Sequence, residues 1–235
     1  MKRLLLADRR EELLATLEVI LRHWGYRVVA CSRLASVEDL LRETEPDLLI
    51  LGTSLTADPR LAPALTEAVR DGKRPLILLA EADVPAPVDL PHESLDVPVD
   101  LFALFRLIQP HLEKFPRRHL RLAIRLPGLL CAGESCHLAE ILSLSSEGLF
   151  LRTCFRFEGE NRLRVVLPLF GMKQELELEG RVLYRVEPTA GNHYLQGIGI
   201  EFTGLTDEAR RQLRSFLESR FLGNLSDRPE GQHLG

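Results

Sequence analysis

The spacing of apolar residues changes near residue 114, and this change constrains the fold more than any other feature of the chain. Before it, short and nearly continuous apolar runs alternate with segments whose apolar residues recur at helical spacing. After it, apolar residues alternate with charged ones, as in ELELEGRVLYRVE at 175–187, and Gly and polar clusters separate the runs. Because 235 residues suffice for two domains, the change predicts two domains of different architecture.

Residues 1–113 predict an α/β domain with a doubly wound parallel sheet. Four apolar runs, RLLLAD, YRVVACS, DLLILG and PLILLA, are separated by helical patterns, and such uniformly apolar runs are typical of strands covered on both faces. Trp24 falls on the apolar face of the first helix, which is expected to end at Gly25, and Ser36 is expected to cap the next helix. The prolines of the segment 82–93 argue against a helix there.

Residues 114–222 predict an antiparallel β-barrel with a closing helix. Three runs alternate apolar and polar residues over strand-length segments. These runs are 161–169, 175–187 and 194–202. The segment 206–221 has the spacing of an amphipathic helix. Its expected inward face is Leu213, Phe216, Leu217 and Phe221. The remaining residues, 223–235, are expected to form a disordered tail.

Composition narrows the classes of function. The formal net charge is −4 and the acidic excess lies in the first half, so the chain does not complement a DNA backbone and DNA binding is not expected. The apolar run at the start ends at Asp8, too short for a signal peptide or a membrane span, so no membrane insertion is expected. Four cysteines are too few for a disulfide scaffold at this length, which favours a reducing cytoplasm.

No arrangement of residues indicates catalysis. The seven His residues are scattered, and no Ser, His and Asp set or carboxylate pair has a recognisable context. Cys131, Cys136 and His137 form a candidate metal cluster, but three ligands at this cysteine spacing do not fit the usual zinc pattern. The sequence therefore predicts a binding protein that is neither an enzyme nor a metalloprotein.

Residues 2–113 combine alternating strands and helices with an acidic residue, Asp8, at the end of the first strand. This order resembles the receiver domain of response regulators. The resemblance implies five functional positions: an acidic pair after the first strand that holds Mg²⁺, an Asp phosphoacceptor, a Thr or Ser, and a Lys. Asp8 matches the first acid, but Arg9, Gly52, Ala80 and Val97 occupy the other four positions. Without the carboxylate nucleophile and the oxygen ligands for Mg²⁺, phosphoryl transfer is not expected.

The first domain is therefore expected to serve dimerisation or docking. The alternative is a small-molecule site at the carboxyl edge of the sheet, where doubly wound sheets bind ligands.

A basic segment, KFPRRHLRLAIR at 114–125, leads into the second domain and contains no acidic residue. Arg117 and Arg121 in this segment are spaced as RxxxR, and Arg118 lies between them. Arg121 and Arg125 form a second pair with the same spacing. The segment is expected to be a basic hinge between the domains.

The run SLSSEGLFL at 143–151 carries a second motif, with Ser145 and Gly148 spaced as SxxG. RxxxR followed by (Asp/Asn)xSxxG in a barrel pattern resembles the PilZ domain, a bacterial receptor for cyclic di-GMP. The resemblance covers 114–222 and departs at Ser143, where Asp or Asn is usual. It implies that cyclic di-GMP is held by Arg117, Arg118, Arg121, Ser143, Ser145 and Gly148.

These residue types suit that ligand. A guanidinium group pairs with phosphate, bonds the O6 and N7 atoms of guanine and stacks on purine faces. A small polar side chain can bond the guanine edge, and a Gly permits close approach of the backbone. A neutral Ser143 in place of an acid loses a charge-assisted hydrogen bond, which is expected to weaken binding by about ten- to a hundredfold.

The sequence thus predicts a cyclic di-GMP-binding signalling effector in which the ligand orders the linker, reorients the domains and alters contacts with an unidentified protein partner. Motility, pilus, biofilm or exopolysaccharide control are the processes that the resemblance implies. The alternative is a ligand-independent adaptor in which both domains serve protein docking. A transcription regulator is disfavoured because the second half offers no helix-turn-helix pair. Association of the chain as a homodimer is left open.

Overall fold

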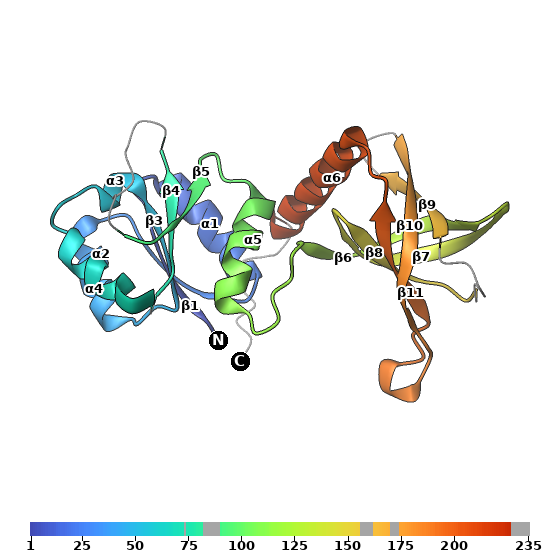
Figure 1. The fold of residues 1–235 in the computed structure, drawn as a ribbon, viewed down its shortest axis with the longest axis horizontal. Helices are drawn as coiled ribbons and strands as arrows, with labels where there is room; N and C mark the ends of the chain where they lie inside the picture. The colour runs from blue at the N-terminus through green and yellow to red at the C-terminus, as the bar shows by residue number, and fades with distance from the viewer. Residues whose placement is uncertain (73, 82–89, 156–161, 170–173, 227–235) are drawn as a thin grey trace. The chain divides into compact units, whose positions relative to one another are not determined.

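The computed structural model describes residues 1–235 except 73, 82–89, 156–161, 170–173 and 227–235 (Figure 1). The chain divides into two compact units, Met1–Arg118 and His119–Gly235. The elements of the first unit are β1 (Arg3–Ala7), α1 (Glu11–His23), β2 (Arg27–Cys31), α2 (Leu34–Glu43), β3 (Leu48–Gly52), α3 (Thr53–Thr56), α4 (Ala62–Val69), the 3₁₀ helix η1 (Arg70–Gly72), β4 (Leu76–Ala80), β5 (Glu93–Asp96) and α5 (Leu101–Leu112).

The first unit is a parallel sheet of five strands in the order β2-β1-β3-β4-β5. Every neighbouring pair in this sheet is parallel. The order reverses between β1 and β3, as in the flavodoxin-like class of doubly wound folds, and ligands of such folds bind beside that reversal. The predicted α/β class of the first domain is confirmed.

Helices cover both faces of this sheet (Figure 1). On one face, Leu5, Leu49 and Leu51 join a buried cluster with Leu41 of α2 and Leu65 of α4. Because successive strand residues point to opposite faces, the alternate residues of β1 and β3 face α1 and α5. Both layers are apolar, which explains why the strands read as nearly continuous apolar runs.

One expectation for this unit is wrong, and another concerns residues that are mostly not described. Helix α2 begins at Leu34 after Arg33, so Ser36 lies inside the first turn and is not the N-cap. Most of the proline-containing segment 82–93 lies outside the described residues, and its end belongs to β5, which pairs with β4.

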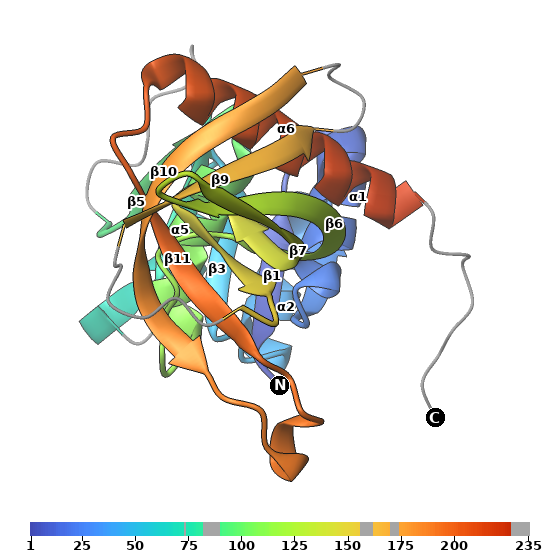
Figure 2. The ribbon, with the colours of Figure 1, turned by 90° about the vertical axis from the view of Figure 1, so that its right-hand side faces the viewer.

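The second unit contains a closed antiparallel barrel in the order β10-β11-β8-β7-β6-β9 (Figure 2). Its elements are β6 (Arg121–Ala132), β7 (Ser135–Ser145), β8 (Gly148–Arg152), β9 (Arg162–Leu169), β10 (Gln174–Val186), the 3₁₀ helix η2 (Ala190–Asn192), β11 (Gly197–Thr203) and α6 (Asp207–Ser226). Alternation along β9 buries Leu163, Val165 and Leu167 and exposes Arg162 and Arg164. The predicted barrel with a C-terminal helix is confirmed.

Helix α6 buries the four residues that its spacing predicted. They are Leu213, Phe216, Leu217 and Phe221. The helix continues to Ser226, so the first residues of the segment 223–235 are helical and the expectation of disorder there is wrong. Residues 227–235 lie outside the described part of the chain.

Cys131 and Cys136 face each other across the β6–β7 hairpin and are joined by a disulfide. The number of cysteines alone did not indicate this pairing, which leaves neither sulfur as a thiolate ligand for a metal. Within the described ranges, no group of three or more His, Cys, Asp or Glu side chains could hold a metal ion.

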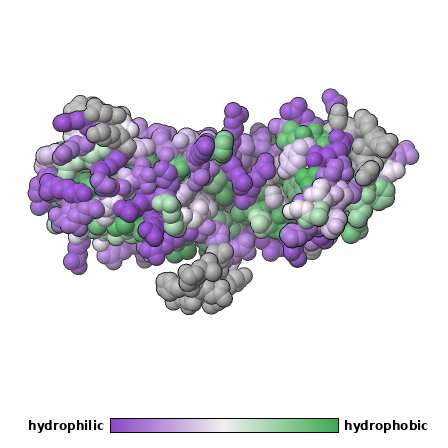
Figure 3. All heavy atoms as spheres, turned by 90° about the horizontal axis from the view of Figure 1, so that it is seen from below, coloured by the Kyte–Doolittle hydropathy of each residue, from purple (hydrophilic) through white to green (hydrophobic). Residues whose placement is uncertain are grey.

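Hydrophilic residues predominate on the face of the molecule shown in Figure 3. Of the helices in the described part of the chain, none has both the length and the apolar character needed to cross a bilayer.

Trp24, the single tryptophan of the chain, reports on the folding of the first unit. Its ring meets Phe105 of α5 edge to face, with centroids 5.2 Å apart. We predict that Phe105→Ala lowers the free energy of unfolding of this unit by about 3–5 kcal/mol, because it removes a buried ring and leaves a cavity. Urea titration followed by Trp24 fluorescence measures this change. Phe115→Ala is the control, since that ring is 81% exposed and its loss should shift stability by no more than about 0.5 kcal/mol.

Candidate functional site

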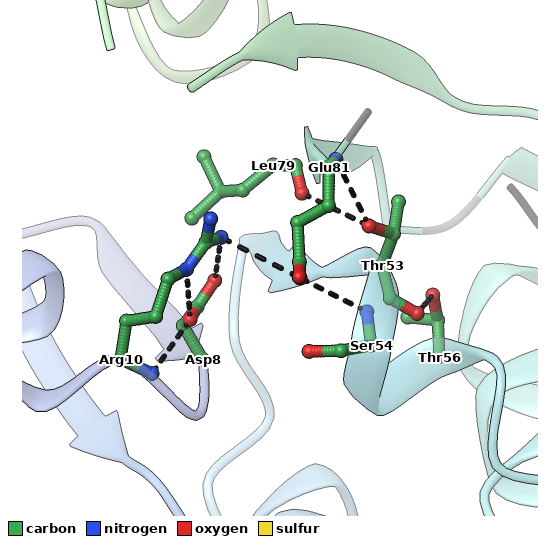
Figure 4. Close-up of polar contacts among 7 residues, drawn as sticks. All are labelled: Asp8, Arg10, Thr53, Ser54, Thr56, Leu79 and Glu81. Atoms are coloured by element: carbon green, nitrogen blue, oxygen red, sulfur yellow. Dashed lines mark hydrogen bonds and ion pairs between the residues drawn. The ribbon is translucent and has the colours of Figure 1, made fainter. Parts of the chain in front are cut away.

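The carboxyl end of the parallel sheet is occupied by an internal ion pair (Figure 4). Asp8, directly after β1, has no solvent exposure. Arg10 donates to it through Nε to Oδ1 at 2.8 Å, through Nη2 to Oδ2 at 2.6 Å and through the backbone N–H to Oδ1 at 2.8 Å. The hydrogen bonds with Asp8 raise the pKa of Arg10 above its usual value. The buried carboxylate therefore has its counter-ion within the chain.

Glu81, directly after β4, joins this pair to the end of β3 (Figure 4). Its Oε1 atom lies 3.7 Å from Nη2 of Arg10 and accepts from the backbone N–H of Ser54 at 3.3 Å. The backbone N–H of Glu81 donates to Oγ1 of Thr53 at 3.2 Å, and that hydroxyl donates to the carbonyl of Leu79 at 3.4 Å. Polar groups after β1, β3 and β4 are thus linked to one another at this edge.

Gly52, at the position of the receiver phosphoacceptor, has no room for a side chain. A Cβ atom built there would lie 2.4 Å from Oδ2 of Asp8. A carboxylate at position 52 would therefore have to displace Asp8 from its bonds with Arg10. A guanidinium group already lies where a metal ion would have to approach Asp8, so these residues do not fit Mg²⁺.

The receiver-like pattern aligns Arg9 with the second acidic position, but the side chain that pairs with Asp8 is Arg10. Arg9 is exposed. The roles of Arg10 and Glu81 were not recognised from the sequence. Their signal was weak, because a basic residue two positions after a strand and an acid directly after another strand are usually solvated.

We predict that Arg10→Met destabilises the first unit by about 2–4 kcal/mol, because it leaves a buried carboxylate without its counter-ion. The value lies toward the lower end of the range for a buried pair because the Arg10 side chain is 34% exposed. Urea unfolding followed by Trp24 fluorescence measures the effect. Arg9→Met removes the adjacent exposed charge and should change stability little, so equal effects of the two variants would contradict this account.

The second candidate site lies where β6, β7 and β8 meet at one end of the barrel. Arg121, the first residue of β6, is directly opposite Ser145, the last residue of β7. Ser143 is opposite Ala123 and is partly exposed. Ser145 is in turn opposite Gly148 at the start of β8. Strand register therefore brings one arginine of the basic segment to the second motif.

Ser145 and Gly148 also have roles in the fold. Ser145 is 2% exposed, and its hydroxyl donates to the carbonyl of Gly148 at 2.9 Å within the β7–β8 turn. A Cβ atom at Gly148 would lie 2.3 Å from the carbonyl oxygen of Ile200 on β11, so a side chain there would force the strands apart. The turn and the close strand spacing thus require these two residues even without a ligand.

Glu147, inside the same motif, contacts the C-terminal helix. Its carboxylate forms an ion pair with Arg210 of α6, and its carbonyl accepts from the backbone N–H of Phe202. This pair could not be recognised from the sequence, because the two residues are far apart in the chain. It links the turn of the candidate site to the first turns of α6.

Arg117 and Arg118 lie in the first unit, in the segment after α5. Both side chains are exposed. The backbone N–H of Arg117 donates to Oε1 of Gln109 at 3.0 Å. The structure thus groups Arg121 with Ser143, Ser145 and Gly148 on the barrel, whereas Arg117 and Arg118 belong to the other unit.

A separate pocket of about 850 Å³ lies over β9, β10, β11 and the β6–β7 hairpin. Cys131 lines it, but none of the residues predicted to hold cyclic di-GMP does. Its arginines include Arg164 and Arg181. They pair with Glu177 at 3.1 Å and with Glu201 at 2.5 Å. Because two of its three arginines, the third being Arg162, are paired with glutamates, the pocket is a weaker candidate for an anionic ligand than the basic segment.

The second half of the chain matches a known protein family. The family model described as PilZ domain matches residues 115–219. The match begins in the basic segment and ends within α6. Comparison with curated proteins gives no match.

Solved structures are similar to parts of the chain. The Bacillus subtilis inhibitor of motility MotI/DgrA is 15% identical over 50% of this chain and 54% of its own, with a TM-score of 0.41. Escherichia coli YcgR in complex with c-di-GMP is 18% identical over 47% of this chain and 49% of its own, with a TM-score of 0.36. The receiver domain of the hybrid histidine kinase CckA is 20% identical over 47% of this chain and 99% of its own, with a TM-score of 0.37. This chain therefore spans about half the length of the first two proteins.

Proposed function

Because residues 115–219 form a PilZ domain, we propose that the protein is a cyclic di-GMP receptor that acts as a signalling effector. The observation that carries this proposal is the register of β6 and β7, which sets Arg121 directly opposite Ser145. Arg121 of the basic motif and Ser145 of the serine motif are separated in sequence and pair at one end of the barrel.

The donor set suits a ligand with two phosphates and two guanines. Arg117, Arg118 and Arg121 are exposed, so their guanidinium groups are free to pair with phosphate or with the O6 and N7 atoms of guanine. Ser143 would bond a guanine edge through its hydroxyl. Ser145 and Gly148 would shape the turn against which the ligand lies.

Binding would act on the segment between the units. Arg117 and Arg118 belong to the first unit and Arg121 to the barrel, so a ligand held by all three would fix the segment that joins them. We propose that this ordering changes the arrangement of the two units and the surface offered to a protein partner. The receiver-like unit would act as a docking module, because its crevice has no phosphoacceptor and Asp8 is already paired with Arg10.

In this proposal the protein is a receptor and not a catalyst, binds no DNA and works in the cytoplasm, where it would meet the messenger. The process controlled would be motility, pilus function, biofilm formation or exopolysaccharide production. The domain limits we propose are 1–113 and 114–222.

We predict that the double variant Arg117→Ala, Arg121→Ala lowers affinity for cyclic di-GMP by about 100-fold or more, because each arginine supplies charge-assisted bonds worth about 1.5–3 kcal/mol. Calorimetric titration measures this loss, with GTP as the ligand control. Arg125→Ala is the matched control, since Arg125 is an exposed arginine of the alternative RxxxR pair on β6. It should bind like the wild type.

Other outcomes would have clear meanings. If Arg125→Ala fails to bind and Arg117→Ala binds normally, the site uses Arg121 and Arg125 instead. If the wild-type protein shows no binding up to about 100 μM, near −5.5 kcal/mol, the receptor proposal is wrong. The ligand-independent adaptor then becomes the better account, because Ser145 and Gly148 are already required by the turn and the strand spacing.

We predict that Ser143→Asp strengthens binding of cyclic di-GMP by about ten- to a hundredfold, because an acid accepts charge-assisted bonds from the guanine N–H groups. Ser143 is partly exposed on β7, so the new carboxylate need not be buried. Ser135→Asp adds the same charge at the exposed far end of β7 and should not strengthen binding. Equal affinity of Ser143→Asp and the wild type would show that position 143 does not contact the ligand.

A further inference from the structure

A buried glutamine in α5 holds the backbone of the basic segment. Gln109 is 7% exposed, and both ends of its amide are used. Its Oε1 atom accepts from the backbone N–H of Arg117 at 3.0 Å, and its Nε2 group donates to the hydroxyl of Tyr26 at 3.2 Å. The amide therefore connects Tyr26, directly before β2, to Arg117, the first arginine of the RxxxR motif.

Tyr26 fixes the orientation of this amide. Its ring is 4% exposed, and its hydroxyl donates to Oε1 of Glu113 at 2.9 Å while accepting from Gln109. Burial, together with the hydrogen bond to Glu113, raises the pKa of Tyr26 well above its usual value, so the hydroxyl remains a donor. With Nε2 of Gln109 engaged by Tyr26, Oε1 is directed at Arg117.

Gln109 and Tyr26, which we call the clamp, hold the backbone of Arg117 and leave its side chain exposed to solvent. Gln109 bonds the N–H group of Arg117, whereas the guanidinium side chain is exposed. A residue whose backbone is already fixed loses less conformational freedom when its side chain binds a ligand. All four residues of this network lie within the first unit.

We propose that Gln109, oriented by Tyr26, is a positioning residue for cyclic di-GMP binding: it holds Arg117 so that its guanidinium is presented to the ligand. Gln109 and Tyr26 then contribute to affinity without contacting the ligand. This inference rests on the proposed function, and it adds residues outside the PilZ domain to the determinants of binding.

Two measurements on the full-length protein test it, one without ligand and one with. Amide hydrogen exchange at residue 117 reports directly on the clamp. Calorimetric titration with cyclic di-GMP reports on its effect on binding. The variants are Gln109→Met, which keeps the length of the side chain but cannot form these hydrogen bonds, and Tyr26→Phe, which keeps the ring and removes only the hydroxyl. Arg106→Gln is the control, because Arg106 is exposed on the same helix.

In Gln109→Met we expect the amide of residue 117 to exchange at least about tenfold faster, with little change in α5, and cyclic di-GMP to bind about three- to tenfold more weakly. Tyr26→Phe should shift both quantities in the same direction by a smaller factor, and Arg106→Gln should shift neither. A merely structural role for Gln109 would instead accelerate exchange throughout α5.

The positioning role is overturned if both clamp variants bind cyclic di-GMP as tightly as the wild type or more tightly. It is also overturned if exchange at residue 117 is unchanged in Gln109→Met. Absence of binding by the wild type would refute the proposed function and the role of Gln109 in it. Exchange at residue 117 would then still show whether Gln109 holds the backbone of Arg117. Failure of the proposed function and failure of the positioning role are therefore distinguishable.

Discussion

The carboxylate of Asp8 has no solvent exposure and lies at the carboxyl end of the parallel sheet. Arg10, two residues further along the chain, balances its charge. Taking an unpaired carboxylate out of water is costly, so Asp8 and Arg10 must remain together in the folded unit. This pair also governs its neighbours. It excludes a side chain at position 52 and takes the place beside Asp8 that a metal ion would need. The unit thus retains the doubly wound architecture without a phosphoacceptor at position 52.

The first unit, which lacks a phosphoacceptor at position 52, is joined directly to the basic segment. Helix α5 ends at Leu112, and the basic segment begins two residues later. Gln109 in the last turn of that helix bonds the backbone of Arg117. Any ligand that draws Arg117 toward the barrel therefore acts on a residue already attached to the first unit. In the proposed function, the same short segment would provide the cations for the messenger, and it is the covalent link between the units.

Apolar spacing predicted both architectures, because burial on both faces or on one face determines whether a strand reads as continuous or alternating. Features that depend on tertiary contacts could not be predicted. Ser36 looked like an N-cap, yet α2 starts earlier, at Leu34. Of two adjacent arginines, the backbone after β1 turns Arg10 inward and Arg9 outward. Gln109 follows no motif, because its partners are Tyr26, directly before β2, and Arg117, beyond the end of α5.

The serine motif shows how a family signature can be partly structural. The Ser145 hydroxyl holds the β7–β8 turn, and Gly148 permits the close approach of β11. A barrel of this kind needs both residues whether or not it binds a nucleotide, so their presence identifies the fold better than the ligand. Whether the protein is a receptor or an adaptor therefore depends on the side chains that the fold does not require. These are the exposed arginines and the residue at 143, where Ser stands in place of the usual Asp or Asn. In the proposed function, binding would therefore rely more heavily on how well the arginines are held.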